Sequence, residues 1–378
     1  MIAFKKWNIE FVKARKESYK KESRNPIIQN GNLKDDQIRR DFTINCMFIC
    51  LNKKEWGNFI DPFGGKKDIK KKKIKTTCNP KKIFIDDPLR MMRAIRISTQ
   101  LKFKISKKVI KTIKKNRKRI KIISKERIMD EMNKIIKSET ASNGLKILFK
   151  TGLLKIIFPK LFDLQGSDSF LGKSHEDNFY KTLKTLKNIS NVNSDLLIKW
   201  CGLFSNVGKL ITKKTNKNIG FIFNKYEKIG SNITYLILKK IKFPIKNNIK
   251  HICKIIKLQL QLTYIMRKNT KKTEIKKIIY KSKNLINELI LIHKANITSK
   301  NSNEIKRKIK KNNQNRNIKI NGNIIMKKLN IKPSKEIKKI KKYIEINILN
   351  EKIKNNEKDI SEYINKNKKK IMKIYENL

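Results

Sequence analysis

Hydrophobic positions along most of this chain recur every three or four residues, which is the spacing of one face of an α-helix. From residue 83 onward this spacing predicts helices and little else. The expected helices cover 87–100, 106–117, 124–137, 141–152, 176–190, 194–204, 224–241, 247–266, 272–293, 302–311, 322–329 and 334–346. Before residue 83 the pattern is mixed: alternation predicts a strand over 6–14, and an acidic first turn followed by apolar residues predicts a helix over 34–51.

The helix expected over 87–100 carries two adjacent stripes of side chains. Arg90, Arg93 and Arg96 form one stripe, and an apolar stripe of Leu89, Met92 and Ile95 runs beside it. Asp87 is placed to cap this helix, with Pro88 in its first turn. Aligned guanidinium groups suit a polyphosphate, and Asp87 with Arg90 offers an acceptor and donors to the edge of a base. A surface helix with salt bridges is the alternative. The use of arginine in a chain that otherwise favours lysine speaks against that alternative.

Composition narrows the choice of partner and compartment only moderately. The chain has 378 residues and a formal net charge of +64, which favours a polyanion such as nucleic acid. Lys, Ile and Asn are abundant everywhere, as expected from an AT-rich genome, so part of this charge reflects codon bias. No apolar run approaches a membrane span, and the five cysteines form no metal pattern. We expect a cytoplasmic protein with reduced thiols and no membrane partner.

Several short motifs occur in order at fitting spacing. They are RRDFTIN (39–45), DPFGG (61–65), DDPLRMMRAIR (86–96), SKERIMDEM (124–132), LLKIIFPKL (153–161) and HEDNFYKTL (175–183). Together they resemble the class II nucleotidyltransferases, the tRNA CCA-adding enzymes and their bacterial poly(A) polymerase relatives. The resemblance is closest to bacterial CCA-adding enzymes with a histidine–aspartate (HD) type helical domain, and it fades after about residue 300.

The resemblance implies roles for the motif residues. Arg40 matches a residue that contacts the nucleotide, and Asp87 with Arg90 matches the pair that selects CTP or ATP by its base edge. Arg93 and Arg96 match arginines that hold the nucleotide. The positions expected to brace the site are Asp41, Glu126 and Arg127.

The family's paired catalytic carboxylates are not found in this sequence. In the family they form an Asp-x-Asp on an early strand and bind Mg²⁺, whereas no Asp precedes Asp35 here. Glu10 is a candidate for a third carboxylate, with an exposed strand residue as the alternative. We therefore expect no metal site in this chain, Mg²⁺ only in a complete enzyme, and no polymerisation by the chain alone. A recorded start that is too late, a separately encoded N-terminal head fragment acting in trans, and a decaying gene are the three open explanations.

The HD-type region also departs from the family. The expected His-Asp pair reads Ser205-Asn206, and further ligand positions read Asn224, Tyr226, Gln259 and Asn296. Because these side chains are poor metal ligands, we predict no metal and no phosphatase activity there. His175 is then a packing or hydrogen-bonding residue.

The predicted fold is mainly α: an incomplete α/β nucleotidyltransferase head followed by an elongated, all-helical neck, body and tail. The expected limits are 1–78 for the head, 79–140 for the neck, 141–300 for the body and 301–378 for the Lys-rich tail. The function implied by the resemblance is addition or repair of the tRNA 3′-terminal CCA from CTP and ATP. A poly(A) polymerase, an enzyme adding part of CCA, a non-catalytic RNA-binding remnant and a decayed product are the alternatives.

Overall fold

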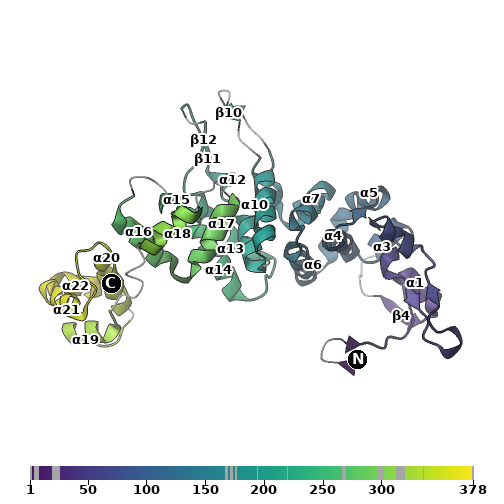
Figure 1. Ribbon diagram of the computed structural model, residues 1–378, viewed down its shortest axis with the longest axis horizontal. Helices are drawn as coiled ribbons and strands as arrows, with labels where there is room; N and C mark the ends of the chain where they lie inside the picture. Colours follow the sequence, from purple (N-terminus) through teal and green to yellow (C-terminus); the bar gives the residue numbers. More distant parts are fainter. Residues whose placement is uncertain are drawn as a thin grey trace. The chain divides into compact units, whose positions relative to one another are not determined.

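The computed structural model describes most of the chain as short strands followed by helices (Figure 1). The described residues are 2–3, 8–18, 26–166, 169–170, 173–174, 177–193, 195–218, 220–265, 270–296, 302–311, 320–334 and 336–376. They form two compact units, Met1–Lys257 and Leu258–Leu378, called here the N-terminal and C-terminal units. The domain limits expected from the sequence stay predictions. None of the described helices combines the length and apolar character needed to cross a lipid bilayer.

The first part of the N-terminal unit consists of paired short strands interleaved with short helices. Its strands are β1 (Ile2–Ala3), β2 (Asn8–Ile9), β3 (Arg15–Ser18), β4 (Ile27–Asn30), β5 (Phe48–Ile49), β6 (Phe59–Ile60), β7 (Lys73–Ile74) and β8 (Lys104–Ile105). Its helices are α1 (Leu33–Arg39), η1 (Thr43–Asn45), η2 (Lys53–Glu55), α2 (Gly65–Lys70) and α3 (Pro80–Asp86). Each described sheet has two strands, antiparallel except for the parallel β7–β8 pair. This mixture followed by helices confirms the predicted fold class.

Helices dominate the rest of the N-terminal unit. They are α4 (Leu89–Leu101), α5 (Lys107–Asn116), η3 (Arg117–Ile122), α6 (Lys125–Lys137), α7 (Ala141–Thr151), α8 (Leu153–Ile157), α9 (Pro159–Phe162), α10 (Asn178–Val192), α11 (Leu196–Phe204), α12 (Lys209–Thr212), α13 (Tyr226–Lys240) and α14 (Lys246–Leu258), which ends at the unit boundary. Two hairpins interrupt them: β9 (Ser169–Phe170) with β10 (Lys173–Ser174), and β11 (Lys213–Asn216) with β12 (Gly220–Phe223).

Helix α4 is the centre of packing in the N-terminal unit. It contacts α3, α6, α7, β7 and β8. The apolar stripe expected from the sequence is buried, with Met92 and Ile95 fully inaccessible to solvent. Further along, Trp200 on α11 stacks on Phe204, and its indole N–H donates to the Asn133 side chain on α6 at 2.9 Å. The Trp200 contact joins α11 to α6, and α6 in turn packs against α4, so the apolar side of α4 is held in the core.

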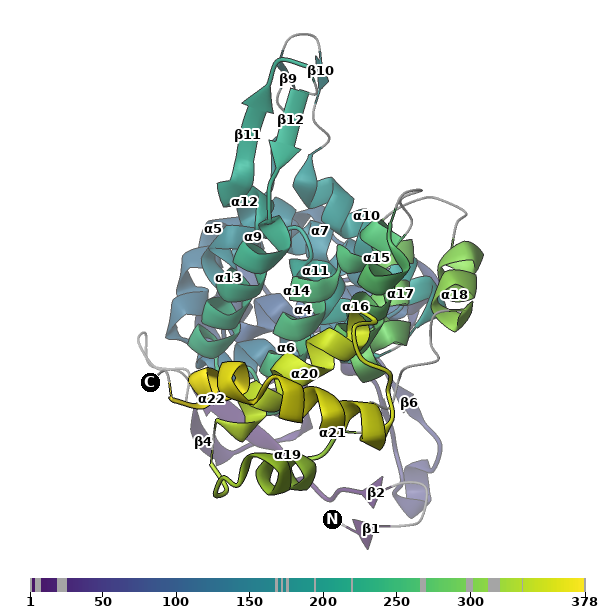
Figure 2. The same ribbon diagram turned by 90° about the vertical axis from the view of Figure 1, so that its left-hand side faces the viewer.

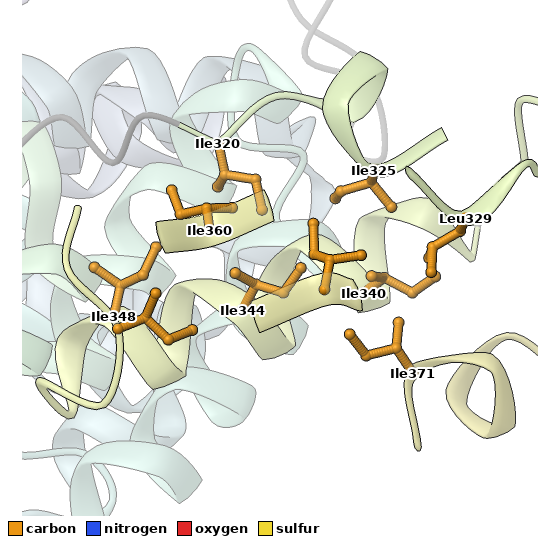
Figure 3. Close-up of a cluster of buried hydrophobic side chains, with 10 residues drawn as sticks. Ile320, Ile325, Leu329, Ile340, Ile344, Ile348, Ile360 and Ile371 are labelled. Carbon is orange, nitrogen blue, oxygen red and sulfur yellow. The ribbon is translucent and has the colours of Figure 1, made fainter. Parts of the chain in front are cut away.

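The C-terminal unit is entirely helical over its described residues. Its helices are α15 (Gln261–Ile265), α16 (Lys272–Ser282), η4 (Lys283–Leu285), α17 (Ile286–Asn296), α18 (Ser302–Lys311), α19 (Gly322–Leu329), α20 (Ile337–Leu349), α21 (Glu357–Lys366) and α22 (Lys368–Glu376). Isoleucines from α19 to α22 form a core that includes Ile325, Ile344 and Ile360 (Figure 3). A Lys/Asn-rich sequence therefore still supplies isoleucine or leucine at most positions of this core.

Several predicted elements differ from the structure. The helix expected over 34–51 ends at Arg39, because Phe42 turns into the core and pairs with Thr76 in an antiparallel bridge. Of the strand expected over 6–14, the structure describes 8–14 and shows a strand only at Asn8–Ile9, and β3 begins at Arg15. The helix expected over 247–266 is divided between α14 and α15, and η4 interrupts the one expected over 272–293. The apolar spacing continues through these breaks, so it did not reveal them.

The glycines of the DPFGG motif have separate structural requirements. Gly64 has φ of +71° with no atom within 4 Å of an added Cβ, whereas a Cβ on Gly65 would lie 2.5 Å from the Thr43 carbonyl oxygen. The amide of Gly65 donates a hydrogen bond to the Asp61 side chain at 2.7 Å, and this bond connects the two ends of the turn. Gly65 is thus required because α2 packs closely against η1.

We expect Gly65→Ala to lower the free energy of unfolding by about 2 kcal/mol, because the Thr43 backbone must move to admit the methyl group. Gly64→Asn is the matched control. It should cost much less, since asparagine tolerates the left-handed conformation and nothing crowds its Cβ. Urea denaturation followed by circular dichroism measures both variants. Equal losses would show that the close approach at Gly65 is not limiting.

Candidate functional site

A cavity of about 570 Å³ lies beside the first half of α4. Its lining contains six arginines and three carboxylates, a formal surplus of three positive charges. The lining residues are Val12, Arg15, Glu17, Pro26, Arg39, Arg40, Asp41, Asn45, Asp87, Arg90, Arg93 and Arg127. They come from β3 and the residues before it, the residue before β4, α1 with the turn and η1 after it, the α3–α4 junction, α4 and α6. The fold therefore brings distant basic residues to one place.

Glu17 is the buried anion at the base of this cavity. Its side chain is 4% exposed, and its Oε1 lies 2.8 Å from Arg15 and 3.3 Å from Arg39. Its Oε2 lies 3.9 Å from a guanidinium nitrogen of Arg90, whose own side chain is 10% exposed. Strand β3 places Arg15 and Glu17 on one side because alternate strand residues share a face. One carboxylate thus connects β3, α1 and α4.

A second buried carboxylate holds the pair of arginines at the end of α1. Asp36 accepts hydrogen bonds from Arg39 Nε at 2.9 Å and from Arg40 Nε at 3.0 Å. Burial alone would raise the pKa of Asp36, but the hydrogen bonds from Arg39 and Arg40 lower it below its usual value. Arg40 also lies over the Phe48 ring at 4.7 Å. These contacts hold the guanidinium of Arg40 at the cavity wall.

Asp41 orients Arg93 from the opposite side. Its Oδ2 accepts a hydrogen bond from Arg93 Nε at 2.6 Å, and its Oδ1 accepts from the Phe42 amide at 3.0 Å and from the Asn45 side chain at 3.1 Å. Asp41 is buried, whereas 39% of the Arg93 side chain remains exposed. The Nε contact leaves the end of the guanidinium directed at the cavity.

Asp87 lies at the junction between α3 and α4. One of its oxygens accepts a hydrogen bond from the Leu89 amide at 3.0 Å, in the capping role predicted for it, although the helix itself begins at Leu89 after Pro88. Its other oxygen is 3.9 Å from Arg127 on α6, which also lines the cavity. Asp87 and Arg90 therefore border the same space.

Three predicted site residues lie outside the lining of this cavity. Arg96 donates to Glu131 on α6 at 2.6 Å and to Gln100 at 2.9 Å, so it connects two helices. Glu126 pairs with Lys242 at 2.6 Å on the surface of α6. Glu10 is exposed, and the carboxylate that this segment brings to the cavity is Glu17. The structure thus separates Arg96, Glu126 and Glu10 from the arginine cluster.

Sequence reasoning missed Arg15, Glu17 and Arg39 as members of the cluster. The signal for Arg15 and Glu17 is their spacing of two residues in a strand, which places an acid and a base on one face. The predicted strand ended at residue 14, so this pairing was not considered. Arg39 belongs to the RRD motif and was noted only as a neighbour of Arg40.

Metal ligands are not gathered in the part of the chain described. No group of three or more His, Cys, Asp or Glu residues there is arranged to hold a metal ion. Ser205 and Asn206, at the degenerate His-Asp position, are buried, and the Asn206 side chain donates to Thr182 at 3.3 Å. His175 lies outside the described residues. Chemically, the arginine cavity offers guanidinium donors for phosphate, and Asp87 adds an acceptor at its edge.

Two family models match this chain in separate regions. The model described as "Poly A polymerase head domain" matches residues 1–75. The model described as "Probable RNA and SrmB- binding site of polymerase A" matches residues 102–164. The cavity receives residues from the first region, from the intervening α4 and, through Arg127, from the second.

Curated relatives are tRNA nucleotidyltransferases. The A-adding tRNA nucleotidyltransferase of Deinococcus radiodurans is 30% identical over 221 residues, covering 56% of this chain and 49% of that protein. The CCA-adding enzyme of Bacillus pumilus is 39% identical over 138 residues, covering 36% of this chain and 33% of that protein. The chain therefore spans half or less of the length of these relatives.

Solved structures share the fold over most of the chain. The CCA-adding enzyme of Bacillus stearothermophilus in complex with CTP has a TM-score of 0.61 at 19% identity, covering 92% of this chain and 77% of that one. Other matched structures are CCA-adding enzymes with ATP or with tRNA. The order of the motifs, the two matched regions and the relatives agree in their similarity to the CCA-adding enzymes and poly(A) polymerases of the class II nucleotidyltransferases, and the solved structures show a shared fold.

Proposed function

We propose that this chain provides the nucleotide-selecting and RNA-binding parts of a tRNA nucleotidyltransferase that adds or repairs the 3′-terminal CCA from CTP and ATP. The observation that carries the proposal is the gathering of Arg40, Asp87, Arg90 and Arg93 around one cavity. The relatives support this proposal because they are named as a tRNA nucleotidyltransferase and a CCA-adding enzyme. A cytoplasmic location accompanies this function and stays a prediction.

In this proposal different cavity residues contact different parts of the nucleotide. Arg40 is held by Asp36 through Nε and Nη2 and donates from Nη1 to the Asn45 carbonyl oxygen at 3.2 Å, whereas Arg93 is held by Asp41 through Nε. Their other N–H groups are the donors proposed for the triphosphate. Asp87 and Arg90 present an acceptor and donors to the base, in place of a template strand. A base that leaves these groups unmatched is rejected because buried polar groups without partners are costly. Asp41 and Arg127 support this arrangement.

We infer that Mg²⁺ acts only in a complete enzyme. The described residues do not fit a Mg²⁺ site, because they contain no cluster of metal ligands, and Glu17 and Asp41 are both paired with guanidinium groups. We therefore assign no reaction step to a metal in this chain. Its residues bind and orient the nucleotide and the RNA. The comparisons lend no support to a separately encoded head fragment.

A narrower activity is the second candidate. The relatives from Deinococcus radiodurans and Aquifex aeolicus are named A-adding enzymes, which adds weight to an enzyme that supplies only part of CCA. A poly(A) polymerase of the same family would likewise use ATP alone. A non-catalytic RNA-binding role requires tRNA binding without nucleotide selection.

We expect Arg90→Lys to weaken CTP binding about tenfold or more while leaving UTP binding little changed. Lysine keeps the charge but loses the planar fork that reads a base edge, and hydrogen bonds to charged groups are worth about 1.5–3 kcal/mol. Equilibrium dialysis with labelled nucleotides measures both affinities. Arg307→Lys, at an exposed position of α18, is the matched control. An equal loss for CTP and UTP would assign Arg90 to phosphate instead of the base.

The chain alone should bind CTP and ATP yet incorporate neither into tRNA that lacks its CCA. This follows because no Asp precedes Asp35, and the described residues offer no metal site. The assay uses labelled CTP and ATP with Mg²⁺ and gel electrophoresis of the tRNA. Incorporation of cytidine would contradict the inferred lack of catalytic carboxylates. Binding of tRNA without either nucleotide would favour the RNA-binding alternative, and selective binding of ATP would favour the narrower activity.

A further inference from the structure

The β11–β12 hairpin rises from the helices of the N-terminal unit, next to β10 (Figure 2). Its register pairs Lys213 with Phe223 and Thr215 with Phe221. Directly opposed residues of an antiparallel pair share one side of the sheet. These four residues therefore form one face of the hairpin, called here the Lys–Phe face.

Lysine side chains lie on the aromatic rings of this face. The Lys213 ammonium is 4.5 Å from the centre of the Phe221 ring. At the base of the hairpin, the Lys209 ammonium on α12 is 5.4 Å from the Phe223 ring and 5.1 Å from the Tyr226 ring. Cation–π contacts thus position both ammonium groups; Lys209 is buried at the base of the hairpin, whereas Lys213 is partly exposed on it. Such positioning distinguishes them from the many lysines that extend freely from helix surfaces.

The stretch of chain that carries the Lys–Phe face is poor in acids. The sequence has no carboxylate from residue 196 to 226, and it has six lysines in that stretch. Of the two flanking acids, Asp195 is occupied in capping α11 through the amides of Leu197 and Ile198, and Glu227 lies in the first turn of α13. A shallow hollow lined by Lys213, Lys214, Thr215 and Phe221 opens on the hairpin. The neighbouring β9 and β10 are flanked in sequence by Asp168, Glu176 and Asp177, of which Asp177 caps α10.

The face suits RNA phosphates better than a lipid or an apolar protein surface. Phe221 and Phe223 are only partly exposed, and each has an ammonium group near its ring, so little apolar area is offered. Lysine that is already held over a ring loses less side-chain entropy on binding, and free lysine loses up to about 2 kcal/mol. Ammonium groups fixed along a ribbon match the repeated charges of a nucleic-acid backbone.

We propose that the Lys–Phe face of the β11–β12 hairpin, together with Lys214 at the alternate strand position and Lys217 in the turn, binds the phosphate backbone of RNA outside the nucleotide cavity. The choice of tRNA as that RNA rests on the proposed function. The hairpin adds affinity that does not depend on base sequence, because phosphate contacts carry no sequence information. It leaves CTP binding in the arginine cavity unchanged, since none of its residues lines that cavity.

The test combines two hairpin variants of the full chain. The first replaces Lys213, Lys214 and Lys217 together with Gln. The second is Phe221→Leu, which keeps every charge but removes the ring beneath Lys213. Binding of tRNA lacking CCA is measured by fluorescence anisotropy at several salt concentrations, with CTP binding measured in parallel as the check on folding.

The matched control replaces Lys70, Lys71 and Lys73 with Gln. These lysines are exposed around the turn between α2 and β7, and their replacement removes the same charge from the chain. We expect the triple hairpin variant to bind tRNA about tenfold more weakly and to flatten the salt dependence by about two phosphate contacts. Phe221→Leu should cost about twofold to fivefold, the worth of an exposed cation–π contact. The control should resemble the parent chain.

Equal effects of the hairpin and control triple variants would overturn the proposal, since general charge would then explain the binding. The proposal would also be wrong if neither hairpin variant changed the affinity for tRNA. An acidic protein would then be the better candidate for a partner of this face. If the chain prefers tRNA no more than an unrelated RNA of equal length, the proposed function fails while the hairpin comparison still decides this inference.

Discussion

The candidate site depends on one buried carboxylate. Glu17 is nearly inaccessible to solvent, and its two oxygens face the guanidinium groups of Arg15, Arg39 and Arg90. A buried charge without its partner costs several kcal/mol, so each of these groups requires the others to remain in place. Because they come from β3, α1 and α4, this one contact joins a strand pair to the helices that follow. The guanidinium of Arg90 has two roles: it pairs with Glu17, which stabilises the fold, and it lines the cavity, where it can contact the nucleotide.

The opposite side of α4 supplies the rigidity that this arrangement needs. Buried residues such as Met92 and Ile95 pack into the helical core, and α6 and α7 lie against the same helix. Arg96 ties α4 to α6 through Glu131 instead of reaching the cavity. The spacing of three residues does not give a uniform row: the Arg90 side chain is 10% exposed, that of Arg93 is 39% exposed beside Asp41, and that of Arg96 is 18% exposed where it joins α4 to α6. A uniform stripe in the sequence becomes three different environments because the helix passes from the cavity into the helical core.

The sequence predicted the parts of the site that lie on a regular helix and could not predict those that depend on chain reversal. Arg90, Arg93 and Asp87 follow from helical spacing and capping, and the structure brings all three to one cavity. Glu17 and Arg15 reach it only because β3 pairs with β4 and returns the chain toward α1, a long-range event that local periodicity does not encode. The same reason explains Phe42, whose bridge to Thr76 ends the predicted helix at Arg39. Helix breaks such as that between α14 and α15 were missed because apolar spacing continues through them.

Lysine abundance illustrates why composition alone is a weak guide to function in this chain. A net charge of +64 makes almost every surface basic, so charge does not single out any one region. Position does. Arg40 and Arg93 are each fixed by a buried aspartate, and Lys213 is fixed by an aromatic ring, whereas Lys70 and Lys71 are simply exposed. A cation that the fold holds in place binds phosphate with less loss of entropy than a flexible one. A basic side chain that is held by a buried acid or an aromatic ring therefore indicates an anion-binding site better than lysine abundance does. Mutational bias toward lysine adds charge, but it does not add the groups that hold that charge in place.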